Sequence, residues 1–232
     1  MYRELLEEAK TMEADLIAWR RKLHTMPELG LELPDTSTFV REKLEEMGIP
    51  YEIKVNGSCV VGILGKGSRC FMLRSDMDGL PFQEESGEEF ASRNGRMHAC
   101  GHDGHATIGL GVAKVLMSIK DQLHGTVKLI FQPAEEGVRG AKSIVDNGHL
   151  DGVDYMIGSH VTNKKEDDPA VVIPGSYGSL ATTKYDVIFH GKSAHAGGSP
   201  EVGRNVMLAV GTAILNLYAI PRHSGGASRV NV

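Results

Sequence analysis

Residues 97–105 concentrate side chains that can bind a metal ion or transfer a proton. Gly101 and Gly104 lie among them and permit a tight turn that brings the backbone close to a bound group. A thiolate, imidazoles and a carboxylate together suit a transition metal such as zinc or manganese better than calcium. The side chains concerned are those of His98, Cys100, His102, Asp103 and His105.

Two later segments complete a possible hydrolytic site. The carboxylates Glu135 and Glu136 follow an apolar strand predicted over residues 126–132, and His160 follows another predicted over 153–158. Side chains at the ends of neighbouring strands can meet although they are far apart in sequence. We therefore predict a metal site, dinuclear and acting on an amide bond, in which Glu135 is free to act as a base. Its predicted ligands are Cys100, His102, Glu136 and His160.

Each of these features also has a purely structural explanation. The Cys100 segment alone could be a loop with a buried thiol, the glutamate pair could lie on the surface, and His160 could be an ordinary strand-end histidine. Their joint occurrence at the ends of apolar strands favours the metal site. We expect four other histidines in turns or at exposed helix ends, without a role in the site: His24, His124, His149 and His223.

The order of the predicted elements indicates an α/β fold, with a mixed sheet flanked by helices. Helices are predicted over residues 3–23, 35–47, 106–119 and 141–147, and strands over 51–55, 59–64, 70–75, 126–132 and 153–158. After a change in composition, a second unit is predicted as a strand (181–190), a helix (202–218) and a strand (227–232). We expect a catalytic domain over 1–178 and the first half of an α+β lid domain over 179–232. Because the second unit stops within a β-α-β pattern, we expect the chain to be a fragment.

Composition narrows the class of partner. The formal net charge of −5, with 41% hydrophobic and 24% charged residues, is typical of a soluble globular protein and gives no reason to expect nucleic acid or a membrane as partner. The sequence has no apolar run long enough to span a membrane and no apolar segment of the signal-peptide kind near its start. Three widely spaced cysteines do not form a disulfide framework. A reducing cytoplasm is the simplest location.

A series of motifs carries a resemblance to a known family. In order, they cover residues 21–30, 75–81, 98–105, 131–137 and 193–197. The series resembles the aminoacylase, hippurate hydrolase and auxin-conjugate hydrolase branch of the dinuclear metallopeptidases. Within that branch, residues 181–186 and 226–232 are most similar to the p-aminobenzoyl-glutamate hydrolases.

The resemblance implies roles for particular residues. It gives the same four metal ligands and the same base, Glu135, and it implies two divalent ions, Mn or Zn. Asp78 and Asp103 are expected beside the metal ligands, and Asp76 stands where the wider superfamily has a metal-binding histidine. His195 matches a lid-domain histidine that approaches the substrate carbonyl. Arg229 and Asn231 match positions that bind the substrate carboxylate.

The resemblance also implies an activity, the hydrolysis of N-acyl or N-aroyl amino acids, with p-aminobenzoyl-glutamate as the favoured substrate. It implies a dimer formed through the lid domain, or a second subunit. Members of the family continue beyond the lid domain and supply one more metal-binding histidine, so we expect this chain alone to be inactive unless another chain supplies the missing part. One alternative is a truncated, inactive binding or regulatory module of the same fold. A redox role for Cys100 is disfavoured because no second cysteine follows in a Cys-x-x-Cys pattern.

Overall fold

A computed structural model of the chain describes residues 2–137, 139–162, 171–173, 175, 183–226 and 228–232. The chain divides into two compact units, Met1–Lys164 and Lys165–Val232. The domain boundary expected between residues 178 and 179 lies outside the described residues and stays a prediction.

The first unit is built on a five-stranded mixed sheet with the order β1-β2-β4-β3-β5. The pairs β1–β2 and β2–β4 are antiparallel, whereas β4–β3 and β3–β5 are parallel. The prediction of an α/β fold with a mixed sheet flanked by helices is therefore confirmed. The strands are β1 (Tyr51–Lys54), β2 (Cys59–Lys66), β3 (Cys70–Asp76), β4 (Gly125–Gln132) and β5 (Tyr155–Gly158).

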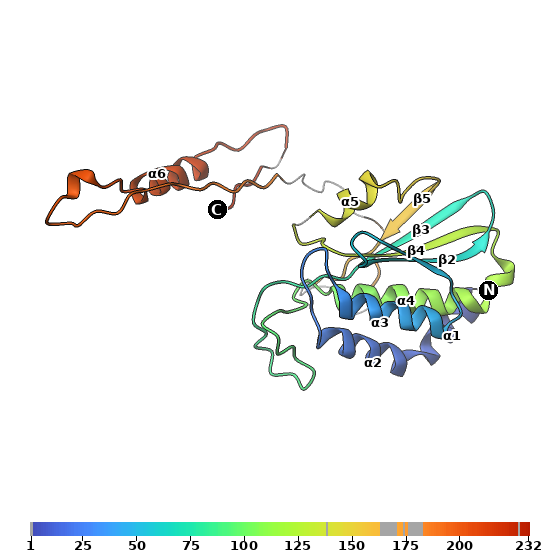
Figure 1. Cartoon of the computed structure of the whole chain (residues 1–232). Helices are drawn as coiled ribbons and strands as arrows, with labels where there is room; N and C mark the ends of the chain where they lie inside the picture. Colours follow the sequence, from blue (N-terminus) through green and yellow to red (C-terminus); the bar gives the residue numbers. More distant parts are fainter. Residues whose placement is uncertain (1, 138, 163–170, 174, 176–182, 227) are drawn as a thin grey trace. The chain divides into compact units, whose positions relative to one another are not determined.

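Helices cover both faces of this sheet (Figure 1). Helices α3 and α4 pack on one face with α2 outside them, and α5 lies on the other. The helices of this unit are α1 (Tyr2–Thr11), α2 (Glu13–His24), α3 (Pro34–Glu46), α4 (His102–Ser118) and α5 (Gly140–Asp146), with a short 3-10 helix at Lys120–Gln122.

Alternation along the strands explains the two layers, because successive side chains of a strand point to opposite faces. On β4, Leu129 and Phe131 belong to the larger core beneath α3 and α4. Ile130, between them, belongs to the smaller core with Ile144 of α5. Both faces of β4 are therefore buried, which fits its position at the centre of the sheet.

The carboxyl ends of the three parallel strands lie at one edge of the sheet. Strand β3 ends at Asp76, which is paired in register with Gln132 at the end of β4. Strand β5 ends at Gly158, two residues before His160. This arrangement places segments that are distant in sequence at the edge where open α/β sheets bind ligands.

In the first unit, two predicted helices differ from the structure by more than a one-residue shift of their ends. The helix predicted over residues 3–23 is two helices, which meet at the buried Met12. Thr11 Oγ1 donates a hydrogen bond to the Glu8 carbonyl, a local bond that bends helices. Helix α4 begins at His102 rather than Ala106, because Gly101 takes a positive φ of 86° and forms its N-cap.

The second unit contains the 3-10 helix Pro200–Val202 and helix α6 (Met207–Tyr218), so the helix predicted there is confirmed in its carboxyl part. The two strands predicted on either side are wrong for the described residues, since 183–190 and 228–232 form no strand. A strand requires a neighbour to accept and donate its backbone hydrogen bonds, and the ladders of the described residues all lie in the first unit.

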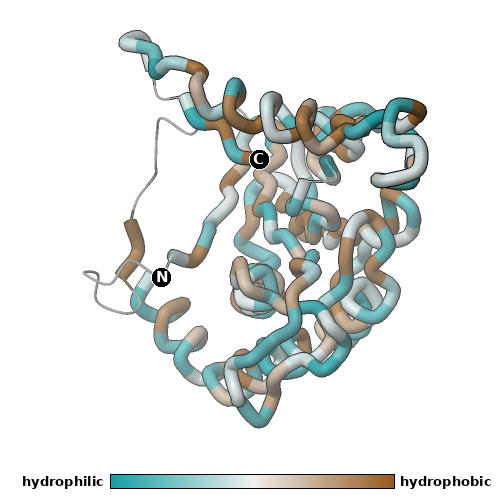
Figure 2. The backbone as a smooth tube through the Cα atoms, turned by 90° about the vertical axis from the view of Figure 1, so that its left-hand side faces the viewer, coloured by the Kyte–Doolittle hydropathy of each residue, from teal (hydrophilic) through white to brown (hydrophobic). Residues whose placement is uncertain are grey.

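None of the described helices is both long and apolar enough to cross a membrane. Hydrophobic and hydrophilic residues are interspersed along the chain (Figure 2).

Candidate metal centre

The turn after β3 is fixed by backbone hydrogen bonds on both sides of Asp78. The Met77 N–H donates to the Gln132 carbonyl at 2.9 Å, and the Gly79 N–H donates to the Glu28 carbonyl at 2.7 Å. A Cβ at Gly79 would lie 2.8 Å from that of Pro27, so only glycine allows this approach. The segment around Pro27 and Glu28 therefore holds Asp78 in place.

Asp78 connects this turn to the two glutamates. Its carboxylate is 1% exposed and accepts the Glu135 N–H at Oδ1 and the Glu136 N–H at Oδ2, each at 2.9 Å. The preceding residue, Ala134, is fully buried with a positive φ of 56°, which is an unfavourable conformation for a residue with a side chain. Asp78 and the turn at Ala134 together fix the start of both glutamate side chains.

His102 is oriented by the same turn. Its Nδ1 donates to the Asp78 carbonyl at 2.8 Å, so its Nε2 faces the opposite way. That Nε2 atom lies 3.9 Å from Glu135 Oε2, 3.9 Å from Glu136 Oε1 and 3.8 Å from Asp76 Oδ2. Three carboxylates thus converge on one imidazole nitrogen.

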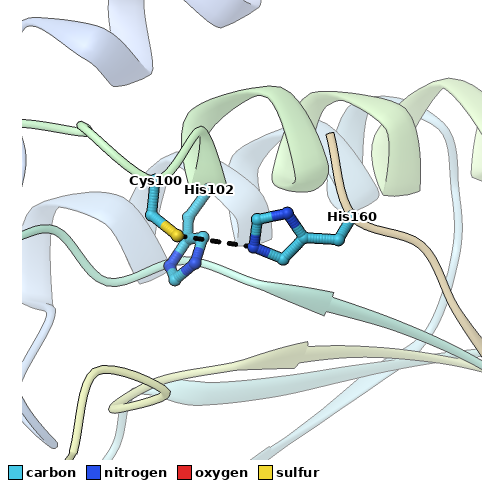
Figure 3. A group of neighbouring side chains, drawn as sticks. All are labelled: Cys100, His102 and His160. Atoms are coloured by element: carbon cyan, nitrogen blue, oxygen red, sulfur yellow. Dashed lines mark hydrogen bonds between the residues drawn. The ribbon is translucent and has the colours of Figure 1, made fainter. Parts of the chain in front are cut away.

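Cys100 and His160 complete the cluster. The Cys100 Sγ lies 3.4 Å from His160 Nε2, although sixty residues separate them in sequence. Figure 3 shows both side chains beside His102, with Cys100 and His102 at the start of α4 and His160 on the segment after β5. The ligand atoms of these three residues lie within 4.8 Å of one another, as do those of His102, Glu135 and Glu136. The structure brings together all four predicted metal ligands and the predicted base.

The cluster has the properties of a cation site. Among the described residues, His102 Nε2 and Glu136 Oε1 are buried without a hydrogen-bond partner. Such atoms cost free energy unless a bound group satisfies them. The set of one thiol, two imidazoles and carboxylates matches the donors that zinc and manganese accept. The residues present therefore fit divalent metal ions.

The electrostatics of the metal-free cluster lead to the same conclusion. Burial, together with the neighbouring carboxylates of Glu136 and Glu135, raises the pKa of the Cys100 thiol to about 12. Burial lowers the pKa of His102, but the hydrogen bond with Asp78 and the charge of Asp76 outweigh it and raise the pKa overall. Burial makes the larger contribution at Cys100, but neighbouring carboxylates raise both pKa values, and a bound cation would neutralise their negative charge.

Asp103, also expected beside the metal ligands, contacts helix α2. Its Oδ2 lies 2.7 Å from Arg20 Nε and 2.7 Å from His24 Nδ1. The other ring nitrogen of His24 lies 3.0 Å from Glu84 Oε1. The expectation that His24 lies at an exposed helix end is wrong: it is 4% exposed, since two carboxylates satisfy its ring nitrogens.

We expect the replacement His24→Gln to destabilise the first unit most at low pH. The hydrogen bond with Asp103 raises the pKa of His24, burial lowers it, the bond with Glu84 raises it, and the net shift is upward. Protonated His24 therefore stabilises the fold fully below about pH 6.5, its ordinary pKa, and this contribution is lost as the pH rises through the folded value. The expected loss in the free energy of unfolding at low pH is about 3 kcal/mol.

Urea unfolding followed by fluorescence would measure this loss, because Trp19 is the only tryptophan and packs against the larger core of the first unit. The control is His124→Gln, at an exposed position. The other charged or titratable groups that face His24 are Arg20 and His98, whose ring centre is 6.3 Å away. If the difference in stability between wild type and His24→Gln did not change with pH, protonated His24 would not be the stabilising form.

Three predicted site residues belong to the second unit. His195 Nδ1 accepts the N–H groups of Gly197 and Gly198 at 3.2 and 2.9 Å within its own turn. Arg229 and Asn231 are exposed. Their roles toward a substrate stay predictions.

His105 and Asp76 are the site residues to which sequence reasoning gave no role. His105 is 1% exposed, and its Nδ1 lies 2.5 Å from Asp76 Oδ1. Burial raises the pKa of Asp76, but the hydrogen bond from His105 and the charge of Arg74 outweigh it and lower the pKa. The signal available in the sequence was the spacing of His102 and His105, because residues three apart share one face of a helix.

Comparison with known proteins identifies the family to which the chain is related. Residues 72–228 match the model of peptidase family M20/M25/M40. The chain is 42% identical over 246 residues to an indole-3-acetyl-aspartic acid hydrolase of Enterobacter agglomerans, covering 99% of this chain and 55% of that protein. It is 39% identical over 264 residues to one subunit of the p-aminobenzoyl-glutamate hydrolase of Escherichia coli K12, covering 92% and 60%. The chain thus spans little more than half the length of these curated relatives.

Solved structures of similar proteins indicate the same family as the sequence relatives do. An aminobenzoyl-glutamate utilization protein from Klebsiella pneumoniae superposes with a TM-score of 0.71 at 32% identity, covering 99% of this chain and 63% of that one. A dinuclear metal-binding peptidase of Bacillus subtilis superposes with a TM-score of 0.63 at 37% identity, covering 68% and 45%. This chain therefore belongs to the M20/M25/M40 peptidase family.

Proposed function

We propose that the protein is a metal-dependent amidohydrolase that cleaves N-acyl or N-aroyl amino acids. The observation that carries this proposal is the convergence of Cys100, His102 and His160 within 4.8 Å, with Glu135 and Glu136 beside His102. In a family of peptidases, a cluster of metal donors next to a free carboxylate is what the hydrolysis of an amide requires.

In this proposal Cys100, His102, Glu136 and His160 hold two divalent ions, manganese or zinc. When bound, such ions lower the pKa of water and stabilise negative charge on a carbonyl oxygen. The remaining chemistry belongs to the side chains. Asp78 fixes the positions of both glutamates through the two hydrogen bonds that its carboxylate accepts, and it orients His102 through its backbone carbonyl.

Glu135 is the proposed general base. Its side chain is 40% exposed, whereas that of Glu136 is 25% exposed, so Glu135 is the more accessible of the two to water and substrate. Its carboxylate takes a proton from the water whose oxygen bonds to the acyl carbon. It then donates that proton to the amine nitrogen as the carbon–nitrogen bond breaks, which yields a carboxylic acid and a free amino acid.

The second unit supplies the proposed contacts with the rest of the substrate. We assign His195 to the substrate carbonyl oxygen, and Arg229 and Asn231 to the amino acid carboxylate. A dimer formed through this unit, or a second subunit, is part of the same proposal. It is supported by the Escherichia coli relative, whose name makes it one subunit of its enzyme.

The proposed substrate class joins an aromatic acyl group to an acidic amino acid. The two relatives described above are named for p-aminobenzoyl-glutamate and indole-3-acetyl-aspartic acid, which share this plan. We favour p-aminobenzoyl-glutamate, with indole-3-acetyl-aspartate as its competitor. Initial rates of amino acid release from both compounds, and from a neutral conjugate of each acyl group, would rank them. Equal rates for acidic and neutral conjugates would exclude the proposed class.

A reducing cytoplasm is the proposed location. Cys59, Cys70 and Cys100 are all free thiols, and Cys100 must stay reduced to bind a metal.

We expect Cys100→Ala to abolish metal binding at the cluster formed with His102 and His160. Cobalt(II) added to the metal-free chain should produce a thiolate charge-transfer absorption, because the Cys100 sulfur faces His160 at 3.4 Å. The variant should lack this band and retain less metal after dialysis. The control is Cys70→Ala, which removes a buried thiol on β3. This variant should give the same charge-transfer band as the wild type when cobalt(II) is added. A band that survives in Cys100→Ala would exclude this cysteine as a ligand.

A further inference from the structure

A buried chain of polar contacts leads from the sheet to the segment that carries His160. Asp76, at the end of β3, is fully buried between two partners. Arg74 Nη1 lies 2.6 Å from its Oδ2, and His105 Nδ1 lies 2.5 Å from its Oδ1. His105 lies near the start of α4, three residues after His102. The carboxylate thus fixes the His105 ring on its Nδ1 side.

The other side of the His105 ring contacts the backbone beyond β5. The Val161 N–H donates a hydrogen bond to His105 Nε2 at 2.9 Å. A backbone N–H can only donate, so Nε2 carries no proton and Nδ1 must carry the one shared with Asp76. The two contacts therefore select a single neutral tautomer of His105.

This contact lies one residue from a proposed metal ligand. The His105 and His160 ring centres are 4.5 Å apart at an interplanar angle of 71°, an edge-to-face arrangement. Gly101 allows the approach of this segment, since a Cβ there would lie 2.4 Å from Val161 Cγ2. His160 itself is exposed, as is the whole of β5, so burial does little to hold it.

We propose that His105, aligned by Asp76, is a positioning residue that fixes His160 for metal binding through the Val161 N–H and ring contact. This inference rests on the proposed function, because it takes His160 to be a ligand. A competing assignment makes Asp76, His102 and His105 a metal site, since their ligand atoms lie within 4.8 Å. The positioning role is favoured because both nitrogens of His105 already have hydrogen-bond partners.

The tautomer gives a test on the metal-free chain. Nitrogen-15 correlation spectra of the histidine rings at mildly alkaline pH should show His105 protonated at Nδ1 and unprotonated at Nε2. His105→Asn identifies the signal by removing it. A His105 ring protonated at Nε2 would overturn the inference.

Two substitutions separate positioning from simple support of the fold. The amide of glutamine reaches the place of Nε2 and can accept the Val161 N–H, whereas the shorter asparagine reaches only the place of Nδ1. We expect His105→Asn to weaken cobalt(II) binding, followed by the Cys100 charge-transfer band, by about 10- to 100-fold. His105→Gln should recover most of that affinity. Thermal unfolding of the metal-free variants would report the contribution of each to the fold.

A second pair tests the same bond from the other side and does not depend on whether the His105 variants fold. Val161→Pro removes the N–H at an exposed position, and Val161→Ala keeps it. Only the proline variant should weaken cobalt binding. Equal cobalt affinity in all the variants would overturn the inference. A His105 variant that loses a cobalt ion but keeps the Cys100 charge-transfer band would also overturn it, because His105 would then be a metal ligand. A wild-type chain without the band would instead refute the proposed function.

Discussion

In protein whose site is completed by the missing part, Glu135→Gln is expected to lower the rate of amide hydrolysis by roughly 10³-fold while leaving metal content unchanged. Glutamine keeps the size of the side chain and the backbone bond between the Glu135 N–H and Asp78, but its amide cannot accept a proton from water. The loss should therefore appear in kcat more than in KM.

The neighbouring glutamate provides the matched comparison. Glu136 Oε1 is buried and unpartnered among the described residues, and it lies 3.9 Å from His102 Nε2. If Glu136 is a ligand, Glu136→Gln should lose metal and activity together, whereas Glu135→Gln should lose activity alone. The two variants differ by one position and conserve the same side-chain volume.

Metal analysis after dialysis and the release of amino acid from p-aminobenzoyl-glutamate would measure the two effects. Loss of metal in Glu135→Gln would make that residue a ligand and contradict its role as the base. A wild-type protein that binds metal and substrate without turnover, unaffected by Glu135→Gln, would instead support a binding or regulatory module.

Asp78→Asn is the second substitution for which we expect a large effect. The buried carboxylate accepts the N–H groups of Glu135 and Glu136, one on each oxygen. An asparagine amide offers one acceptor and one donor, so one of the two N–H groups would face another donor. Leaving such a buried group unpaired costs about 1–3 kcal/mol of the free energy of unfolding.

The same substitution should weaken metal binding by about 10- to 100-fold, although Asp78 itself is not proposed to bind the metal. It would displace the start of both glutamate side chains and loosen the turn whose carbonyl orients His102. Urea unfolding and cobalt titration would measure the two losses, with Asp121→Asn, an exposed position, as the control. An Asp78→Asn protein with wild-type stability and wild-type cobalt affinity would contradict this role.

The chemistry of the site was largely predictable from the sequence, because it depends on residue types next to recognisable apolar strands. The strand before Asp76, the strand before Glu135 and the strand before His160 are all present, within a few residues of their predicted bounds. Parallel strands that end at one edge of a sheet bring such side chains together, so Glu136 and His160 could be named as neighbours before their distance was known. Cys100 and His102 were named from residue type, because they lie at the start of α4 and not at the end of a strand.

Hydrogen bonds between distant segments were not predictable in the same way. His24 was expected to be exposed because a polar residue at a helix end usually is, and its burial depends on Asp103 and Glu84, far away in sequence. His105 had no role until the structure showed the Val161 N–H against its Nε2. The strands predicted over 181–190 and 227–232 are absent from their described parts, 183–190 and 228–232, for a related reason, since a strand is defined by the partner beside it.

The sequence by itself therefore determined which side chains could bind a metal and which carboxylate could act as a base, since these follow from residue type and from the ends of strands. The tertiary structure alone decided how those groups are held: by the two carboxylate bonds of Asp78 and, in our proposal, by the ring of His105. The physical reason is that donors and acceptors pair across space, and their geometry exists only after the sheet and its helices have packed.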